Sequence, residues 1–339
     1  MKKRFLCLGI ESSCDETAAA VVADGQTVLS NVIASQIETH KKYGGVVPEI
    51  ASRCHVQAVN MVLERAVSEA GVDFSELDLV AVTKGPGLVG SLLVGVSAAK
   101  AAAYVHKLPL VGVNHLEGHI AANFLGKAAF PAVCLLVSGG HTELVYLPSK
   151  GEYELLGTTR DDAAGEAFDK IARALNLGYP GGPKIDRLAA LGDPGAYNFP
   201  QGLSKEDTLD FSFSGLKSAV LNYLNQYKGE RDEKWLQDLC AGVQRSITEI
   251  LVMRTITAAQ RKNAGQIFLA GGVACNSGLR RLMQAEAEKH GFHVTFPEPI
   301  LCTDNAAMIA AAGTIAYQRG ERADLSLNAY PSLDLHFSR

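Results

Sequence analysis

Short apolar runs alternate along the chain with longer segments whose apolar residues recur at helical spacing. FLCLGIESSCDETAAAVVADG, from residue 5, and AVCLLVSGGHTELVYLPSKG, from residue 132, each predict a strand, a polar turn and a second strand. Residues 49–71 and 91–107 predict helices, and residues 77–87 predict a buried strand that ends in a Gly-Pro-Gly turn. Because strand–helix units follow a hairpin in each half, we expect a duplicated α/β domain; the alternative is a chance likeness of two ordinary hairpins.

The second half adds a third turn and two long helices. FLAGGVACNSGLRRLM, from residue 268, leads from a strand into a helix. Residues 233–263 predict a long amphipathic helix, and residues 304–319 predict another with Asp304 at its N-cap.

Length and composition indicate how these elements divide. A chain of 339 residues with 47% hydrophobic and 20% charged residues predicts two well-filled domains, with one larger domain as the alternative. We expect one lobe at residues 1–128 and a second at 129–325, followed by a tail at 326–339 to which we assign no function. Residues 151–232 are rich in turns, so we expect them to form an insertion of loops and short helices within the second lobe.

Charge, cysteine use and hydropathy narrow the class of protein. The formal net charge of −4 argues against a chain that coats nucleic acid by charge alone. Seven cysteines without a Cys-x-x-Cys pair are typical of a reducing compartment. The start MKKRFLCLGIESSC lacks the features of a signal peptide, and uninterrupted apolar runs stay shorter than about 18 residues. We therefore expect a cytoplasmic protein that does not enter a membrane.

The segment HLEGH places two histidines four residues apart, at His115 and His119. Residues at this spacing share one face of a helix and can bind one ion. A third ligand is needed, and Asp304 is the best candidate. Two imidazoles and one carboxylate would leave coordination positions open, as a reactive Fe(II) or Zn(II) centre requires. The alternative is a pair of surface histidines that bind no ion.

The same segment does not fit a zinc protease. In His-Glu-x-x-His the glutamate directly follows the first histidine and acts as the general base. Here the acid is Glu117, which lies about 200° around a helix from His115. The protease interpretation therefore fails on geometry.

Glycine pairs at residues 139–140, 181–182 and 271–272 adjoin apolar runs. Backbone N–H groups of such turns can approach phosphate oxygens closely. None of the three matches a P-loop or a dinucleotide fingerprint. Three such turns in a duplicated frame favour a nucleotide held between two lobes.

Acidic residues accompany these turns. Asp169 and Asp186 are candidates for hydrogen bonds to ribose hydroxyls. Glu11, in IESSCDET, is either a strand-end hydrogen-bond acceptor for a turn or a functional carboxylate. The sequence leaves both readings of Glu11 open.

Several long segments together resemble one family. They are GIESSCDET, YGGVVPEIASRCH, GPGLVGSLLVG, NHLEGH, LVSGGHTELV, DDAAGEAFDKIARALNLGYPGGP, FSFSGLK, AGGVACN and CTDNAAM. In this order, and over about residues 5–325, they resemble the signature segments of the TsaD family. The resemblance implies an actin-like duplicated α/β fold, shared with sugar kinases and Hsp70 chaperones, with a cleft between its lobes. It also implies a tRNA N6-adenosine threonylcarbamoyltransferase, which transfers threonylcarbamoyl from threonylcarbamoyl-AMP to the adenosine 3′ of the anticodon in tRNAs reading A-starting codons.

The resemblance also assigns residues. The family's metal ligands fall on His115, His119 and Asp304, which implies one divalent metal per subunit, Fe(II) favoured and Zn(II) possible. Its substrate-binding positions fall on Leu136, Val137, Ser138, Gly139, Gly140, Asp169, Gly182, Asp186 and Asn276. Ser138 to Gly140 would cradle the adenylate.

The implied reaction needs an activated donor and partners. The donor is a mixed anhydride, so no protein nucleophile is required. A base near the adenine amine would help, and Glu11 is a weak candidate. The resemblance implies three classes of partner: tRNA, an inert paralogue of the same fold (TsaB-like) and a small P-loop ATPase (TsaE-like). A kinase of the same fold and a non-enzymatic scaffold are the rivals, and neither explains HLEGH together with Asp304.

Overall fold

The computed structural model describes residues 4–335, which divide into two compact units. The first unit contains residues up to Ala128 together with those from Pro297 onward, and the second contains Ala129–Phe296. The expected boundary near residue 128 agrees with this division. The expectation that the second lobe runs to residue 325 does not, because the segment after Pro297 packs with the first unit.

The first unit is built on a sheet in the order β3-β2-β1-β4-β5. The first three strands pair antiparallel as a meander, and β1, β4 and β5 run parallel. The strands are β1 (Leu6–Glu11), β2 (Glu16–Ala23), β3 (Thr27–Ser35), β4 (Leu79–Gly85) and β5 (Leu110–Asn114). Because β1, β4 and β5 are parallel, their carboxyl ends meet at one edge of the sheet.

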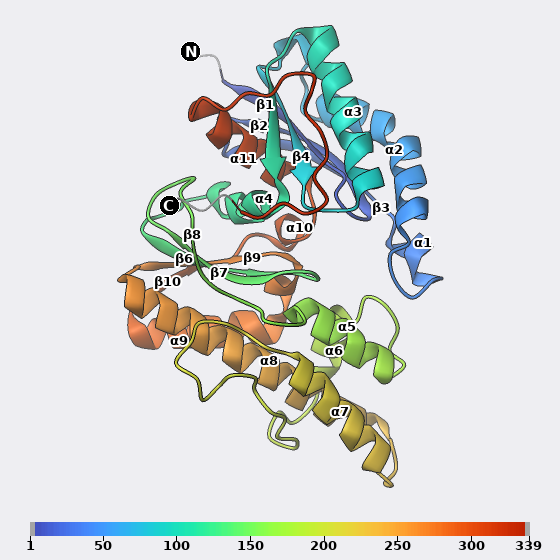
Figure 1. Cartoon of the computed structure of the whole chain (residues 1–339), viewed down its shortest axis with the longest axis vertical. Helices are drawn as coiled ribbons and strands as arrows, with labels where there is room; N and C mark the ends of the chain where they lie inside the picture. Colours follow the sequence, from blue (N-terminus) through green and yellow to red (C-terminus); the bar gives the residue numbers. More distant parts are fainter. Residues whose placement is uncertain (1–3, 336–339) are drawn as a thin grey trace. The chain divides into compact units, whose positions relative to one another are not determined.

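Helices cover both faces of this sheet. Helices α2 (Pro48–Glu69) and α3 (Val89–His106) pack on one face, and α11 (Ala306–Gln318) packs on the other (Figure 1). Helix α11 lies very close to β1, since a Cβ atom at Gly9 would stand only 2.2 Å from the carbonyl oxygen of Ala306. Three short helices complete the unit: α1 (Ile37–Lys41), α4 (His115–Ala121) and α10 (Pro299–Cys302).

Among the described residues, α3 is the one helix long and apolar enough by length and composition to cross a membrane. Its small residues Ser91, Gly95, Ala99 and Ala103 are buried, and it contacts β4 and α2. The helix is therefore used as a core element of the first unit, and its small residues let it pack closely on the sheet.

The second unit repeats the plan with the strand order β10-β9-β6-β7-β8. Again three strands form an antiparallel meander, and β6, β9 and β10 run parallel. The strands are β6 (Ala132–Val137), β7 (Thr142–Leu147), β8 (Glu154–Thr158), β9 (Gln266–Ala270) and β10 (His293–Thr295). The duplicated α/β plan expected from the two hairpins is thus confirmed strand for strand.

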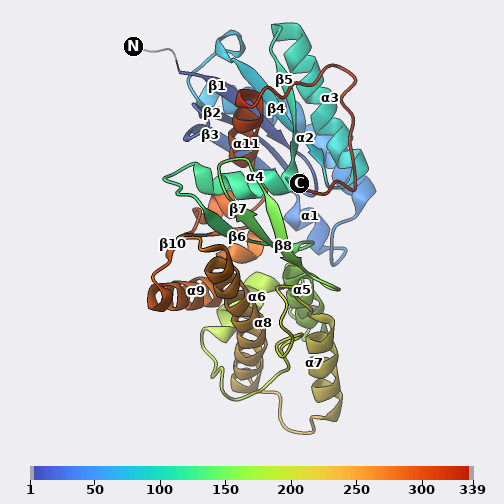
Figure 2. The same cartoon turned by 60° about the vertical axis from the view of Figure 1, so that its left-hand side comes forward.

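Helices of the second unit come from the segment expected to be an insertion and from the residues after it. They are α5 (Ala164–Ala174), α6 (Gly182–Ala189), α7 (Ser214–Gln226), α8 (Glu233–Lys262) and α9 (Ser277–His290). Helix α8 packs on β6, β7 and β9, and α9 packs against α8 (Figure 2). The expected insertion starts too early, because residues 154–158 form β8 and belong to the sheet.

Candidate metal centre and active site

The local sequence places both histidines of HLEGH on one short helix. Strand β5 ends at Asn114, whose side-chain oxygen accepts a hydrogen bond from the Leu116 amide and caps α4. His115 and His119 then stand one turn apart on the same face. Both imidazoles are buried in the first unit.

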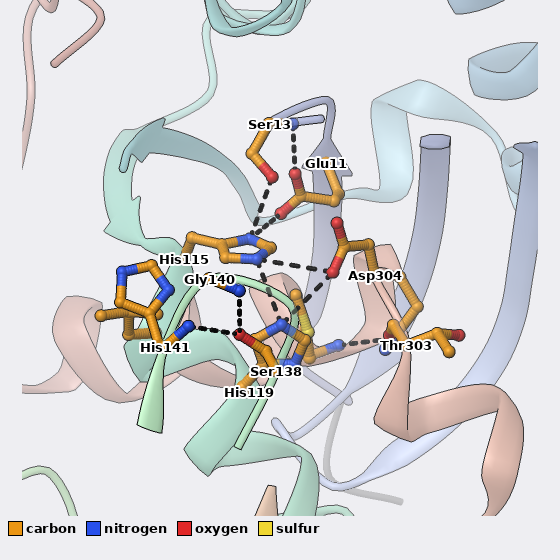
Figure 3. A network of polar contacts seen from close by, with 12 residues as sticks. Glu11, Ser13, His115, His119, Ser138, Gly140, His141, Thr303 and Asp304 are labelled. Atoms are coloured by element: carbon orange, nitrogen blue, oxygen red, sulfur yellow. Dashed lines mark hydrogen bonds and ion pairs between the residues drawn. The ribbon is translucent and has the colours of Figure 1, made fainter. Parts of the chain in front are cut away.

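The third residue of the cluster comes from the far end of the chain. Asp304 lies between α10 and α11, where α11 begins at the carboxyl edge of the sheet. Its Oδ1 is 3.5 Å from His115 Nε2 and 3.3 Å from His119 Nε2. The two Nε2 atoms are 3.1 Å apart, so three ligand atoms point at one spot (Figure 3). This geometry agrees with the hypothesis that His115, His119 and Asp304 bind one ion.

These separations fit one ion. Ligand distances of about 2.0–2.2 Å place neighbouring ligand atoms roughly 3.0–3.5 Å apart around a tetrahedral or octahedral centre. The three observed separations, 3.1, 3.3 and 3.5 Å, fall in that range. Two imidazole nitrogens and one carboxylate oxygen are ligands that both iron and zinc accept. The cluster can therefore hold a single divalent metal ion.

The electrostatics of the cluster also suit a cation. Burial by itself raises the pKa of Asp304, but the imidazoles of His115 and His119 outweigh burial and hold that pKa well below its usual range. Burial and the neighbouring His115 lower the pKa of His119, whereas the Glu11 and Asp304 carboxylates outweigh burial and raise the pKa of His115 well above its usual value. Carboxylates that favour a proton on His115 also favour a metal ion at the cluster, and metal binding would release that proton.

Glu11 stands behind the cluster at the end of β1 and is fully buried. Its carboxylate accepts hydrogen bonds from the Ser13 amide at 2.5 Å and the Thr83 hydroxyl at 2.6 Å. It lies 2.9 Å from His115 Nδ1, so it fixes the tautomer that donates from Nδ1 and turns Nε2 toward Asp304. Such a carboxylate–histidine pair orients a metal ligand. Because three donors engage Glu11, this geometry favours a positioning role, and its role as a base stays a prediction.

We expect Glu11→Gln to lower metal affinity about 10- to 100-fold, because an amide cannot accept all three hydrogen bonds and leaves His115 free to rotate. Chelator-competition titration of the purified protein with Co(II) measures the change. Glu69→Gln is the control, since the Glu69 carboxylate pairs with Arg65 on the exposed side of α2. Equal affinities for Glu11→Gln and the wild type would contradict the positioning role.

The substrate-binding residues inferred from the resemblance all lie in the second unit. Leu136 and Val137 are buried at the end of β6, and Gly139 and Gly140 are exposed with open space around them. The Ser138 hydroxyl accepts hydrogen bonds from the Gly140 amide at 3.4 Å and the His141 amide at 3.1 Å (Figure 3). The turn is thus shaped by its own serine and leaves its glycines accessible.

Two neighbouring backbone segments pack tightly on this turn. The Gly165 amide donates to the Ser138 carbonyl at 3.2 Å. Gly271, which follows β9 with φ +86°, could not carry a Cβ without meeting the Val137 carbonyl oxygen at 2.4 Å. The turns after β6 and β9 and the start of α5 therefore meet at the carboxyl ends of parallel strands, where α/β sheets bind ligands.

The remaining inferred residues form one connected row. The Asp169 carboxylate on α5 accepts the Gly181 amide at 2.7 Å, next to Gly182 at the start of α6. The Asp186 carboxylate on α6 accepts the amide and hydroxyl of Ser277. Asn276 precedes Ser277 and caps α9 through the Leu279 amide. Asp169 on α5 thus holds the start of α6, Asp186 on α6 holds the start of α9, and the contact of either carboxylate with a ribose stays a prediction.

Comparison with known proteins identifies the chain. A family model described as "TsaD: tRNA N6-adenosine threonylcarbamoyltransferase" matches residues 27–311. The chain belongs to the TsaD family. A tRNA N6-adenosine threonylcarbamoyltransferase of Bacillus cereus is 56% identical over 337 residues, which cover 99% of this chain and 98% of the relative. One from Clostridium kluyveri is 54% identical over 338 residues, 99% of each chain.

Solved structures agree on the fold. HypF of T. kodakarensis has a TM-score of 0.63 at 14% identity and covers 94% of this chain and 49% of its own. Component A of the Acidaminococcus fermentans (R)-2-hydroxyglutaryl-CoA dehydratase has a TM-score of 0.53 at 15% identity, with 93% and 98% covered. The family recognised from the motifs, the actin-like fold class and the tRNA-modifying transferase activity are thereby confirmed.

Sequence reasoning missed several residues of this TsaD-family site. Thr83 lies within the buried strand β4 and Ser13 lies in a polar turn, and neither position has a spacing that points to Glu11. The expected N-cap Asp304 is wrong: the cap of α11 is Asn305, whose side chain accepts from the Met308 amide. Asp304 is thereby left to face the histidines. An Asp-Asn pair before an apolar helix is the one signal that could have suggested this division.

Proposed function

We propose that the chain transfers threonylcarbamoyl from threonylcarbamoyl-AMP to N6 of the adenosine 3′ of the anticodon in tRNAs reading A-starting codons. The observation that carries the proposal is the buried convergence of His115, His119 and Asp304 in a chain of this family. Those three residues would hold one divalent ion, with Fe(II) favoured and Zn(II) possible. A metal at an open site of this kind supplies Lewis acidity and a template for donor oxygens.

The reaction is an acyl transfer. The N6 amine attacks the carbamoyl carbonyl carbon, the bond from that carbon to the phosphate oxygen breaks, and AMP leaves with the electron pair. N6 loses one proton, which passes to water or to the phosphate of the departing AMP. Because the donor is already a mixed anhydride, the protein has to orient the reactants and stabilise the departing phosphate.

The chain's own residues divide this work between binding and orientation. The turn from Leu136 to Gly140 would present backbone N–H groups to the adenylate, since its glycines are exposed and a Cβ atom at Gly139 or Gly140 would meet nothing within 4 Å. Gly182 and Asn276 would extend that binding segment, and Asp169 and Asp186 hold the helix starts around them. Glu11 would keep His115 Nε2 directed at the cluster.

The net charge of the chain favours a tRNA-binding surface to which partner proteins contribute. At −4 the chain carries no excess of positive charge to hold tRNA, and phosphate contacts normally dominate RNA binding. We propose that an inert paralogue of the same fold and a small P-loop ATPase supply part of the RNA surface. We also propose that the reaction takes place in the cytoplasm, where tRNA and the free thiols expected from the cysteines coexist.

Mass spectrometry of tRNA nucleosides after depletion of the protein tests the proposal. We expect threonylcarbamoyladenosine to disappear and to return when the wild-type chain is supplied. Elemental analysis of the purified protein should find about one Fe or Zn per chain. Unchanged threonylcarbamoyladenosine would contradict the proposal, and phosphorylation of a sugar by ATP would favour a kinase of the same fold.

A further inference from the structure

Asn114 lies between β5 and the helix that carries both histidines, and it is 1% exposed. Its Oδ1 accepts the hydrogen bond from the Leu116 amide at 2.9 Å that caps α4. Its Nδ2 donates to the backbone carbonyls of Leu333 at 3.4 Å and Asp334 at 2.9 Å. All these bonds come from one planar carboxamide. The carbonyls of Leu333 and Asp334, which hold Nδ2, therefore fix the orientation in which Oδ1 faces the helix.

Asn305 repeats this arrangement beside the third ligand, Asp304, and is fully buried. Its Oδ1 accepts from the Met308 amide at 3.0 Å and caps α11. Its Nδ2 donates to the carbonyls of Leu301 and Thr303. Each ligand-bearing segment therefore has an adjacent asparagine that caps a helix while two carbonyls hold its amide.

The two asparagines differ in where those carbonyls come from. For Asn305 they lie two and four residues away along the chain. For Asn114 they lie 219 and 220 residues away, in the C-terminal tail, defined here as residues 326–335. The end of the chain is thus a direct partner of the residue that caps the HLEGH helix.

The tail reaches Asn114 along a defined path. Before the tail begins, the Ala323 amide donates to the Leu110 carbonyl at the start of β5. The Tyr330 amide then donates to the Lys84 carbonyl at 2.7 Å, and the Gly87 amide donates to the Pro331 carbonyl at 3.1 Å. In Figures 1 and 2 the red trace of this segment passes over the sheet and ends beside α4.

The sheet is shaped to receive the tail. Gly85, with φ +149°, could not carry a Cβ, which would stand 1.9 Å from the Tyr330 carbonyl oxygen. At Gly112 a Cβ would stand 2.8 Å from the Leu327 side chain. Near the end of the described chain Leu335 is only 4% exposed. The tail is therefore packed, with a buried apolar residue just beyond the two carbonyls that hold Asn114.

We propose that the C-terminal tail is a positioning element of the metal centre, acting through Asn114 on the helix that carries His115 and His119. The inference rests on the proposed metal centre. Helix α4 has only seven residues, which form two turns. Its cap fixes the first turn, which carries His115, and the second turn, which carries His119, continues directly from it. Groups that orient metal ligands typically change affinity about 10- to 100-fold when they are removed, so a loosened cap is expected to lower affinity.

The test uses six full-length proteins: wild type, Asn114→Ser, Asn305→Ser, Leu335→Ser, and the two double variants that combine Leu335→Ser with each asparagine substitution. Serine keeps an oxygen that can cap a helix and removes the carboxamide N–H donors. Leu335→Ser removes the buried anchor of the tail. Chelator-competition titration with Co(II), the visible Co(II) spectrum and the melting temperature of the metal-free protein are measured for each.

We expect Asn114→Ser and Leu335→Ser each to lower Co(II) affinity by about 10-fold or more and to change the Co(II) spectrum. Adding Leu335→Ser to Asn114→Ser should have little further effect, because the two act on one link. Adding Leu335→Ser to Asn305→Ser should lower the Co(II) affinity by the same factor as Leu335→Ser does alone. The carbonyls that hold Asn305 lie two and four residues away and not in the tail, so the two substitutions act independently.

Two results would overturn the proposal. The first is a Leu335→Ser protein that melts earlier but keeps the affinity and spectrum of the wild type, as a purely structural tail requires. The second, which stands even if Leu335→Ser fails to fold, is unchanged Co(II) affinity in Asn114→Ser. A wild-type protein that binds no Co(II) would instead contradict the metal centre itself, and the tail's role with it.

Discussion

Replacing Asp304 with alanine is expected to reduce threonylcarbamoyl transfer by about 10³-fold, which corresponds to about 4 kcal/mol of lost transition-state stabilisation. Asp304 is the one carboxylate among the three converging ligands, and two imidazoles alone seldom retain an ion. Purified Asp304→Ala should contain no stoichiometric metal and should keep its fold by circular dichroism. Transfer is measured as threonylcarbamoyladenosine formed in tRNA from added threonylcarbamoyl-AMP.

Glu298→Ala is the matched control for this substitution, because Glu298 is an exposed carboxylate that directly precedes α10. It should keep both metal and activity. His115→Ala should behave like Asp304→Ala, since it removes another ligand atom from the same cluster. Full transfer by a metal-free His115→Ala/His119→Ala protein would contradict the role of the metal.

The second large effect is expected at Gly271, where Gly271→Ala should lower the free energy of unfolding by about 2–4 kcal/mol. Alanine is strained at φ +86°, and its Cβ would stand 2.4 Å from the Val137 carbonyl oxygen. The turn after β9 would have to move away from the turn after β6. We therefore also expect a higher KM for threonylcarbamoyl-AMP, measured together with urea unfolding.

Gly272→Ala is a neighbouring control for this effect. A Cβ at Gly272 would meet nothing within 4 Å, and its φ is not positive. Its unfolding midpoint should match the wild type within error. If Gly271→Ala unfolds at the same urea concentration as Gly272→Ala, the close packing of the two turns does not stabilise the protein.

Much of the fold could be predicted because its signals are local. The helices expected at residues 49–71, 91–107 and 233–263 appear as α2, α3 and α8 with ends shifted by only a few residues. The hairpins at residues 5 and 132 appear as β1–β2 and β6–β7. Apolar periodicity and glycine stops depend on neighbours in the chain, so no tertiary information was needed.

Element boundaries that depend on packing were less predictable. Residues 154–158 look like part of a turn-rich segment but pair with β7 as strand β8. The last helix is expected within the second lobe at residues 129–325, yet α11 packs on β1, β2 and β4 of the first unit. In both cases the deciding contacts join residues far apart in the chain, which periodicity does not report.

Three features could be inferred from the order of residues alone: two histidines share a helix face, glycine turns follow the strands, and the motifs are those of this family. Each of these follows from spacing or from the order of motifs. Three contacts are seen only in the folded chain: Asp304 meets those histidines, Glu11 holds His115, and the tail holds Asn114. The physical reason is that these partners are brought together by sheet pairing and by the packing of α11. A ligand cluster is defined by separations of a few ångströms, and no pattern along the chain encodes distances between residues so far apart.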